Sequence, residues 1–175
     1  MPYQQRWSKG LLASAVLVAI AAASGAAVAG TATSNLPVSA TVSANCTIDA
    51  SGGVSFGAYD PIVTNASTDL TQSGTISTTC TNGSSATITL DQGANANTGS
   101  TAAAPLRRML AGTSNYLSYQ LYSDSGMTTV FDGVTGVGVT GTGAAVSTTV
   151  YGSVTAGQNV PAGSYADTVV ATVTF

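Results

Sequence analysis

The sequence predicts an all-β protein with one sandwich domain, and three observations lead to that prediction. Apolar and polar residues alternate with period two in several segments, whereas patterns of helical period are rare. Outside the apolar residues the chain is mostly Thr, Ser, Gly and Asn, and these residues together with Val are typical of strands and turns. The alternating segments are short and separated by turn residues, which is typical of a sandwich rather than of an α/β fold.

The first 29 residues have the features of a secretory signal peptide. Arg6 and Lys9 form a basic start, an apolar run extends from Leu11 to Ala23, and small residues end at Ala27-Val28-Ala29. A membrane-spanning helix needs about 20 apolar residues, which is more than this run contains. We therefore expect cleavage after Ala29 rather than a retained anchor, and residues 30–175 suit one exported domain.

The charged residues of the expected mature chain argue against nucleic-acid binding and catalysis. Residues 30–175 contain two arginines and seven aspartates, a formal net charge of −5, and no lysine, histidine or glutamate. Two arginines cannot neutralise a phosphate backbone. The absence of histidine and lysine excludes the common general bases and amine nucleophiles, and the aspartates are scattered singly beside turn residues. We expect neither an enzyme nor a cofactor site.

The two arginines of the mature chain, Arg107 and Arg108, are adjacent. They are candidates for binding an anionic ligand or for pairing across a subunit boundary. Because seven carboxylates compete for them, we expect each arginine to pair with an aspartate of its own domain.

Cys46 and Cys80 both lie in the exported part of the chain. An exported pair of cysteines with no further partner predicts one disulfide. The loop between them spans residues 47–79, and closing a loop of that length stabilises a fold by about 4 kcal/mol in the chain-entropy model. A metal site is a poor alternative, because no histidine or carboxylate cluster completes four ligands.

Alternation and turn residues define the expected elements of the domain. Strands are predicted at Val54–Gly57, Leu70–Cys80, Ala86–Leu90, Leu117–Tyr122, Val146–Val154 and Tyr165–Phe175. Residues 92–104 are predicted to form a loop, residues 133–143 a loop or an irregular edge, and residues 157–163 a turn.

The N-terminal segment of the mature chain also alternates, with its apolar residues at even positions. From Ala32 to Ala44 one face of an extended strand is apolar, and Cys46 continues that face. At the other terminus the last strand ends on Phe175, so we expect an open sheet edge there. A free strand and an open edge in one chain suggest strand addition between copies, although the N-terminal strand pairing within its own sheet is an equally good interpretation.

Several short motifs spread over the mature chain carry a resemblance to a known family. They are Cys46-Thr47-Ile48; Phe56-Gly57 with Tyr59 and Pro61; Gly74-x-Ile76 leading to Cys80; Leu90-Asp91-x-Gly93; Arg107 to Met109; Leu117-x-Tyr119-x-Leu121-Tyr122-x-Asp124; Tyr151-Gly152; Pro161-x-Gly163-x-Tyr165-x-Asp167; and Val173-x-Phe175. In this order, and with the ending on Phe, the chain resembles the spore-coat-protein-U domain family, which includes the subunits of archaic chaperone–usher pili.

The resemblance implies an incomplete immunoglobulin-like β-sandwich that is completed by donor-strand exchange. It implies three partners: a periplasmic chaperone that supplies the missing strand, an outer-membrane usher, and further copies of the chain. Two positions depart from the family pattern. Family members often have Trp near Phe131, and Pro37 removes one backbone donor from the proposed donor strand, so the backbone nitrogen of residue 37 is expected to face away from the acceptor groove.

The resulting hypothesis is a structural pilin, secreted through the periplasm to the cell surface, whose polymer supports adhesion or biofilm formation. It divides the chain into a signal peptide (1–29), a donor strand (30–44) and a pilin domain (45–175). Leu36, Val38, Ala40 and Val42 are the expected plugs that enter a neighbour's groove. The alternative is a secreted, self-contained β-sandwich that binds carbohydrate or calcium.

Overall fold

The computed structural model describes residues 28–175, so the expected signal peptide lies almost wholly outside the described residues. The chain divides into two units, one extending to Ala40 and the other comprising Thr41–Phe175. Among residues 28–175, regular structure begins at Cys46 and lies entirely in the second unit. In the part of the chain that the structure describes, no helix has the length and apolar character needed to cross a bilayer.

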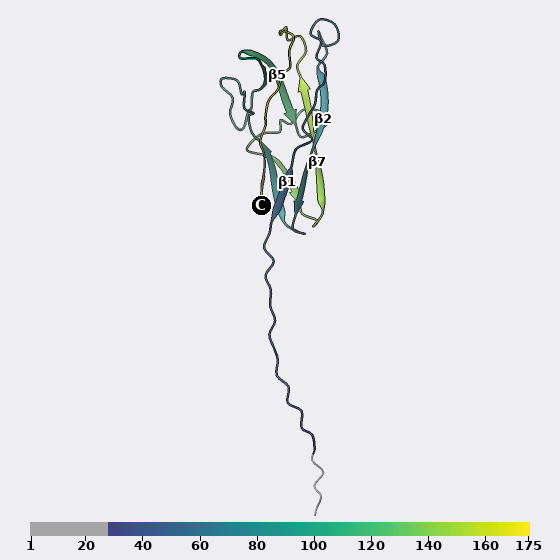
Figure 1. Cartoon of the computed structure of the whole chain (residues 1–175), viewed down its shortest axis with the longest axis vertical. Helices are drawn as coiled ribbons and strands as arrows, with labels where there is room; N and C mark the ends of the chain where they lie inside the picture. The colour runs from purple at the N-terminus through teal and green to yellow at the C-terminus, as the bar shows by residue number, and fades with distance from the viewer. Residues whose placement is uncertain (1–27) are drawn as a thin grey trace, which may run out of the picture. The chain divides into compact units, whose positions relative to one another are not determined.

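The domain consists of two antiparallel sheets (Figure 1). The larger sheet has five strands in the order β1 (Cys46–Asp49), β2 (Leu70–Cys80), β7 (Ala145–Val154), β5 (Asn115–Tyr122) and β4 (Arg107–Ala111). The smaller sheet has three strands in the order β6 (Val137–Thr140), β3 (Ser85–Leu90) and β8 (Ala171–Thr174). β1 is therefore an edge strand of the larger sheet, and β8 is an edge strand of the smaller one.

Period-two alternation places one face of each sheet in a common core. Among the described residues, the buried core cluster is drawn from both sheets: Ile76, Ile88, Leu90, Leu117, Tyr119, Leu121, Phe131, Val150 and Val154. The longest ladder joins β2 to β7, from Leu70 opposite Val154 to Thr79 opposite Ala145. The predicted all-β sandwich is confirmed.

Most of the predicted strands are confirmed in position. Leu70–Cys80 forms β2 as predicted, and β3, β5 and β7 extend the predicted Ala86–Leu90, Leu117–Tyr122 and Val146–Val154 by one or two residues. Strand β4 was not predicted from the sequence. The region predicted as a loop or an irregular edge contains β6, which is an edge strand of the smaller sheet.

Two predicted strands are wrong in extent, and both errors have the same physical cause. Residues 54–57 form no strand, and of the predicted Tyr165–Phe175 only Ala171–Thr174 does so, preceded by a single bridge between Ala166 and Leu110. Both segments still alternate between half-buried and exposed residues, as extended chain does. They lack a ladder because part of their backbone has no neighbouring strand.

The predicted donor segment, residues 30–44, forms no strand in the single chain. The side chains of Leu36, Val38 and Val42 are 85%, 88% and 82% exposed. Three large apolar side chains on one alternating face are thus left in solvent, which is the condition that a partner groove would relieve.

Candidate functional site

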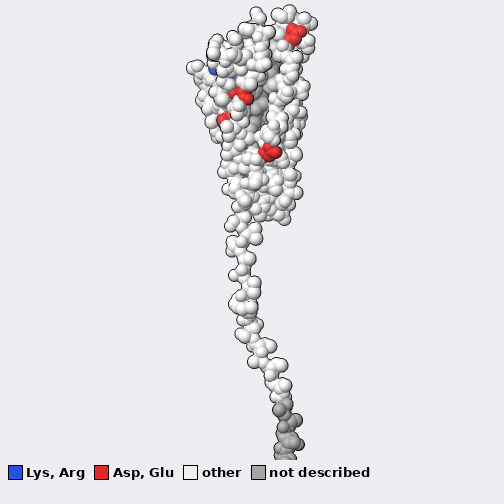
Figure 2. Space-filling model, viewed as in Figure 1, with Lys and Arg blue, Asp and Glu red and all other residues white. Residues whose placement is uncertain are grey.

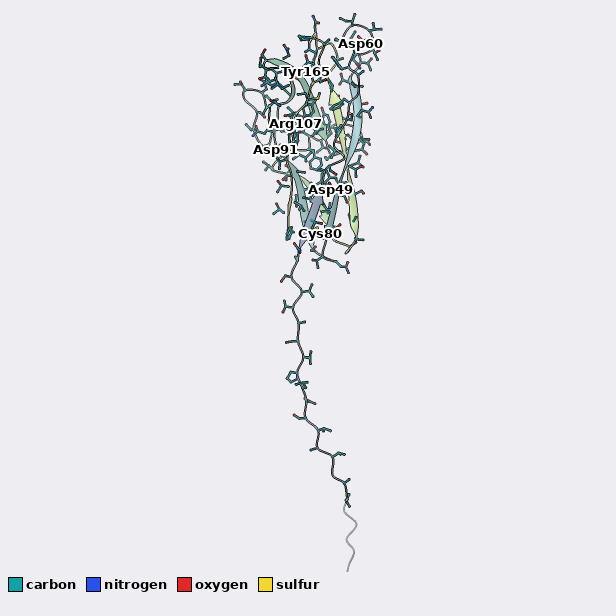
Figure 3. The ribbon with its side chains drawn as sticks, viewed as in Figure 1. Asp49, Asp60, Cys80, Asp91, Arg107 and Tyr165 are labelled. Carbon is teal, nitrogen blue, oxygen red and sulfur yellow. A yellow bond between two sulfur atoms is a disulfide. The ribbon has the colours of Figure 1, made fainter. Side chains whose placement is uncertain are left out.

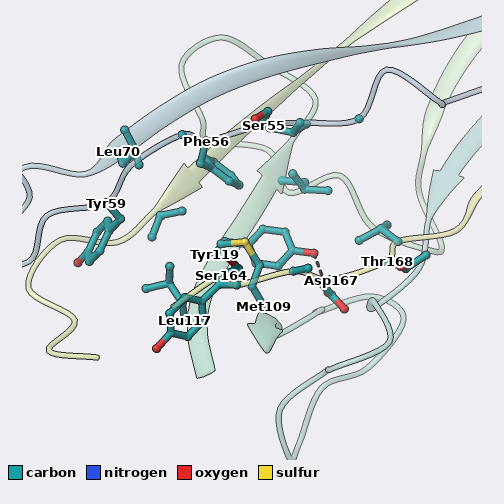
Figure 4. Close-up of a pocket in the computed structure, with 18 of the residues that line it drawn as sticks. Ser55, Phe56, Tyr59, Leu70, Met109, Leu117, Tyr119, Ser164, Asp167 and Thr168 are labelled. Atoms are coloured by element: carbon teal, nitrogen blue, oxygen red, sulfur yellow. Dashed lines mark hydrogen bonds between the residues drawn. The ribbon is translucent and has the colours of Figure 1, made fainter. Parts of the chain in front are cut away.

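The candidate site is an apolar groove of about 990 Å³ within the Thr41–Phe175 domain (Figure 4). Its floor consists of inward-facing side chains from both sheets, namely Leu70, Ile76, Leu90, Met109, Leu117, Tyr119, Leu121, Val150, Val154 and Ala171. Its two rims are the segment from Gly53 to Tyr59 and the segment from Val160 to Val169. The groove therefore lies where the two sheets of the sandwich fail to close.

The rim that leads into β8 is extended chain with hydrogen bonds on one side. Ala166 exchanges both backbone hydrogen bonds with Leu110, and the carbonyls of Thr168 and Val170 accept from the N–H groups of Ala94 and Asp91. Even-numbered residues thus direct their backbone groups away from the groove.

The odd-numbered residues of this rim direct their backbone groups the other way, because successive residues of extended chain alternate. No hydrogen bond joins the backbone of Tyr165, Asp167 or Val169 to another described residue. The same alternation continues through Ala171 and Val173 on the open edge of β8. The rim therefore offers unpaired donors and acceptors at every second residue from 165 to 173, which is the edge that an added strand would need.

A buried polar contact holds this rim in place (Figure 4). The hydroxyl of Tyr119 on β5 donates to Asp167 Oδ2 at 2.7 Å, and Asp167 Oδ1 accepts from the backbone N–H and the side-chain amide of Asn95 at 3.1 and 2.9 Å. Burial, together with the hydrogen bond to Asp167, raises the pKa of Tyr119 well above its ordinary value. The phenol therefore remains a donor at every physiological pH, and the rim is anchored without an added strand.

Arg107 on β4 ties the two sheets together next to the groove. Its side chain is only 1% exposed. The guanidinium donates to the carbonyls of Leu90, Asp91 and Phe131 and, at 2.7 Å, to Gln120 Oε1. Desolvation lowers the pKa of Arg107 from its ordinary value, although the group remains charged at neutral pH. Because Leu90 ends β3, this side chain links the larger sheet to the smaller one.

The expected pairing of the arginines with aspartates is wrong. In the described part of the chain both guanidinium groups donate to backbone carbonyls or to an amide, and Arg108 also stacks 3.9 Å above the ring of Tyr116. The arginines donate to carbonyl oxygens at the end of β3 and in the loop that follows it. The nearby carboxylates of Asp91 and Asp167 instead accept hydrogen bonds from backbone N–H groups of that loop and, for Asp91, also of the rim. The backbone, rather than a carboxylate, satisfies the cations.

The opposite rim packs closely on the larger sheet. A Cβ on Gly152 would lie 2.7 Å from the Phe56 ring, so the glycine on β7 allows this ring to approach the strand closely. Phe56 in turn meets Tyr119 edge to face at 6.0 Å. The hydroxyl of Tyr59 donates to the carbonyl of Thr155 at 2.9 Å. From Val54 to Tyr59 no backbone group is hydrogen-bonded to another described residue, so this rim also has unpaired backbone groups.

The two predicted cysteine residues are brought together as expected. Cys46 on β1 and Cys80 on β2 are directly opposite in the ladder and form a disulfide. It lies toward one end of the domain, whereas Asp60 and Tyr165 lie toward the other (Figure 3). The disulfide holds β1, a strand of only four residues, at the edge of the larger sheet.

The surface around the groove carries little charge. On the face shown in Figure 2 the acidic side chains lie apart from one another, and most of the surface is uncharged. In residues 28–175 no three His, Cys, Asp or Glu side chains group closely enough to hold a metal ion. The chemistry that this site supports is the burial of apolar side chains together with backbone hydrogen bonding.

Of this site, the sequence predicted the last strand, although with too great a length, and did not predict the groove floor or the anchors of the rim. The plugs Leu36, Val38, Ala40 and Val42 stay a prediction. The spacing Tyr165-x-Asp167-x-Val169 contained a usable signal, since a carboxylate at an inward position needs a buried partner such as Tyr119.

Comparison with known proteins places the chain in a family. A model of the Spore Coat Protein U domain matches residues 32–172. Protein U of Myxococcus xanthus is 46% identical over 142 residues, which cover 77% of this chain and 79% of that protein.

A solved structure has the same fold. It is a chain of the CsuC–CsuE chaperone–tip adhesion subunit pre-assembly complex from the archaic chaperone–usher Csu pili of Acinetobacter baumannii. The match has a TM-score of 0.52 and 20% identity, and it covers 77% of this chain but 40% of that one. The expected immunoglobulin-like sandwich is confirmed. The two-sheet fold, the motifs and the family match agree, and the chain belongs to the spore coat protein U domain family.

Proposed function

We propose that this chain is a structural subunit of a chaperone–usher pilus, and not an enzyme. Copies polymerise head to tail, because residues 30–44 of one copy complete the sandwich of the next. The observation that carries the proposal is the open groove of about 990 Å³, whose two rims have unpaired backbone groups. An added strand would satisfy both needs of the groove at once, since it brings alternate apolar side chains and a hydrogen-bonding backbone.

The predicted donor segment fits the groove in length and in pattern. The open edge from Tyr165 to Val173 spans eight residue steps, about 27 Å of extended chain. The segment from Ser34 to Val42 has the same number of steps and carries the four plugs Leu36, Val38, Ala40 and Val42 at two-residue spacing. With these plugs facing the floor, each would lie over the apolar surface that neither sheet covers.

The proline in the donor segment is compatible with this arrangement. Two residues that lie opposite each other in a ladder have their side chains on the same face of the sheet. The even-numbered donor residues, whose side chains would point into the groove, therefore lie opposite the odd-numbered rim residues, whose side chains also point into it. The backbone groups of even donor residues then point at β8, and those of odd residues point at the other rim. Pro37 is odd, so the N–H that it lacks is not needed in the ladder with β8.

The partners follow from the same proposal. Before assembly the groove needs temporary cover, which a periplasmic chaperone supplies, and an outer-membrane usher exports the subunit to the cell surface. The structural neighbour, a chaperone–subunit complex from chaperone–usher pili, supports this assignment. The resulting fimbrium supports adhesion or biofilm formation, and no cofactor takes part.

Placing a carboxylate on the buried face of the donor tests the proposal. Burial of Val38 contributes about 1.5–3 kcal/mol, and a charge in the same place lacks a partner in the apolar groove. We expect Val38→Asp to abolish the surface polymer while the subunit level with its chaperone is unchanged. The readout is the ladder of unboiled samples on SDS gels, together with the periplasmic subunit level.

The matched control is Ser39→Asp, which puts the same charge on the opposite face of the donor. It should leave most of the polymer intact. If instead both substitutions remove the subunit itself, Val38 belongs to the core of its own domain. The self-contained binding module for carbohydrate or calcium would then be the better interpretation.

A further inference from the structure

The end of the groove near Tyr165 carries an exposed apolar turn that the proposed donor strand does not cover. Ile62 and Val63 are 73% and 76% exposed. They directly follow Pro61, which lines the groove. The turn from Asp60 to Asn65, here called the apical turn, therefore continues the apolar surface of the groove onto the end of the domain (Figure 3).

The apical turn is rigid although its tip is apolar. Asp60 Oδ1 accepts from the N–H groups of Ile62 and Val63 at 2.9 and 3.1 Å, and Asp60 and Asn65 are joined by two further hydrogen bonds. These amide donors lower the pKa of Asp60 from its ordinary value. Asn65 is buried and its carbonyl accepts from Gly157. A fixed pair of large apolar side chains in solvent is a feature typical of an interface.

The direction of the donor strand in the groove determines whether the donor's own domain lies next to the apical turn. Antiparallel pairing with β8 is the more stable arrangement, and it brings Val42 of the donor to the Tyr165 end of the groove. The parallel arrangement would bring the donor's own domain to the Cys46 end instead. That end is where the recipient's own N-terminal segment leaves the fold, at Asn45, which is hydrogen-bonded to Thr81. Crowding there also favours the antiparallel direction.

The short segment between the donor strand and its own domain limits where that domain can lie. Val42 and Cys46 are four residue steps apart, about 13 Å of extended chain. With Val42 in the groove, the donor's domain must lie directly over the apical turn. The end that it presents consists of two turns beside Cys46, at residues 81–84 and 141–144, which are hydrogen-bonded to each other through Gly83 and Gly141. Asn82 and Ala144 are exposed on these turns.

We infer that the apical turn of each subunit, through Ile62 and Val63, packs against the turns bearing Asn82 and Ala144 of the subunit whose donor strand fills its groove. This contact is separate from donor-strand insertion and limits bending between successive domains. The inference rests on the proposed function, because the donor strand brings the two surfaces together.

Engineered cysteines test the contact in the assembled polymer. Both natural cysteines are already paired, so a new thiol has no free partner within the described chain. Two double variants are compared, Val63→Cys with Ala144→Cys and Val63→Cys with Asn82→Cys. At least one should give a ladder that survives boiling in SDS without reductant and collapses to monomer with reductant. The control is Val134→Cys with Ala144→Cys, because Val134 is 63% exposed but lies on another loop.

Each outcome bears on a different claim. Unboiled, reduced samples report donor-strand assembly, and boiled, unreduced samples report the apical contact. If every cysteine variant shows the unboiled ladder but neither double variant is cross-linked more than the control, the proposed apical contact is contradicted. Donor-strand assembly is still supported by that result. Donor-strand assembly and the apical contact are both supported if only Val38→Asp loses the unboiled ladder and the assembled double-cysteine variants are cross-linked. As a second readout, Ile62→Ser with Val63→Ser should assemble fully and give fibres with a shorter persistence length.

Discussion

The neighbouring arginines illustrate how differently two identical side chains contribute to this fold. Arg107 is buried and donates to three carbonyls and an amide, whereas Arg108 is half-buried on the edge strand β4 and lies over Tyr116. Their adjacency in the sequence gives no sign of this, because strand alternation sends one inward and the other outward but does not say which. The carbonyls that receive Arg107 come from chain segments distant in the sequence.

Arg107→Met should therefore be far more destabilising than Arg108→Met. Removing the Arg107 guanidinium leaves buried acceptors without donors, at about 1–3 kcal/mol for each, so we expect a loss of at least about 3 kcal/mol. Arg108→Met loses a half-buried stacking contact worth about 0.5–1 kcal/mol and the hydrogen bonds to the carbonyls of Asn95 and Ala96, which lie nearer to solvent than those of Arg107. Urea denaturation of the two variants beside the parent measures the difference, and equal losses would contradict the role assigned to Arg107.

At the scale of elements, the two rims of the groove explain both the success and the failure of sequence-based prediction. Strands with partners on both sides, such as β2, β5 and β7, were predicted from alternation. Residues 54–57 and 165–170 have the same alternation but form no ladder, because the backbone groups on one side of each segment have no partner among the described residues. Strand β4 was missed because its three central residues are all half-buried, so Arg-Arg-Met-Leu-Ala does not alternate.

The rim that contains Phe56 depends on a missing side chain in β7. A Cβ on Gly152 would lie 2.7 and 2.9 Å from two atoms of the Phe56 ring and 3.0 Å from Val54. Gly152→Ala should push this rim off the sheet, at a cost of about 1–3 kcal/mol, and reduce surface polymer. Gly138→Ala on β6, where a Cβ meets nothing within 4 Å, is the matched control. If Gly152→Ala has the melting temperature and the amount of surface polymer of the wild type, the rim tolerates the methyl group and this prediction is wrong.

At the scale of the whole molecule, the groove is a sandwich core that one chain leaves partly open. Half-buried apolar residues from both sheets and both rims surround it, including Val54, Tyr59, Met109, Val160 and Val169. Folded domains have a margin of only about 5–15 kcal/mol, so an uncovered core of this size makes an isolated subunit marginal. Composition and alternation predicted an open sheet edge and an N-terminal segment with one apolar face. The depth of the groove and the anchors of its rim depend on contacts between distant residues, which alternation does not encode.

Moving residues 30–44 to a position after Phe175, joined through a short glycine-rich turn, tests whether this segment completes the sandwich. Strand β8 runs toward the Cys46–Cys80 end of the domain, so the appended segment can return along it in the antiparallel direction. The same chain with Val38→Asp in the moved segment is the control. We predict a monomer that melts at a higher temperature than the control, with slow amide exchange at Asp167 and Val169, whose N–H groups are unpaired in the open groove. Equal melting temperatures and fast exchange at both residues would contradict donor-strand completion of this sandwich.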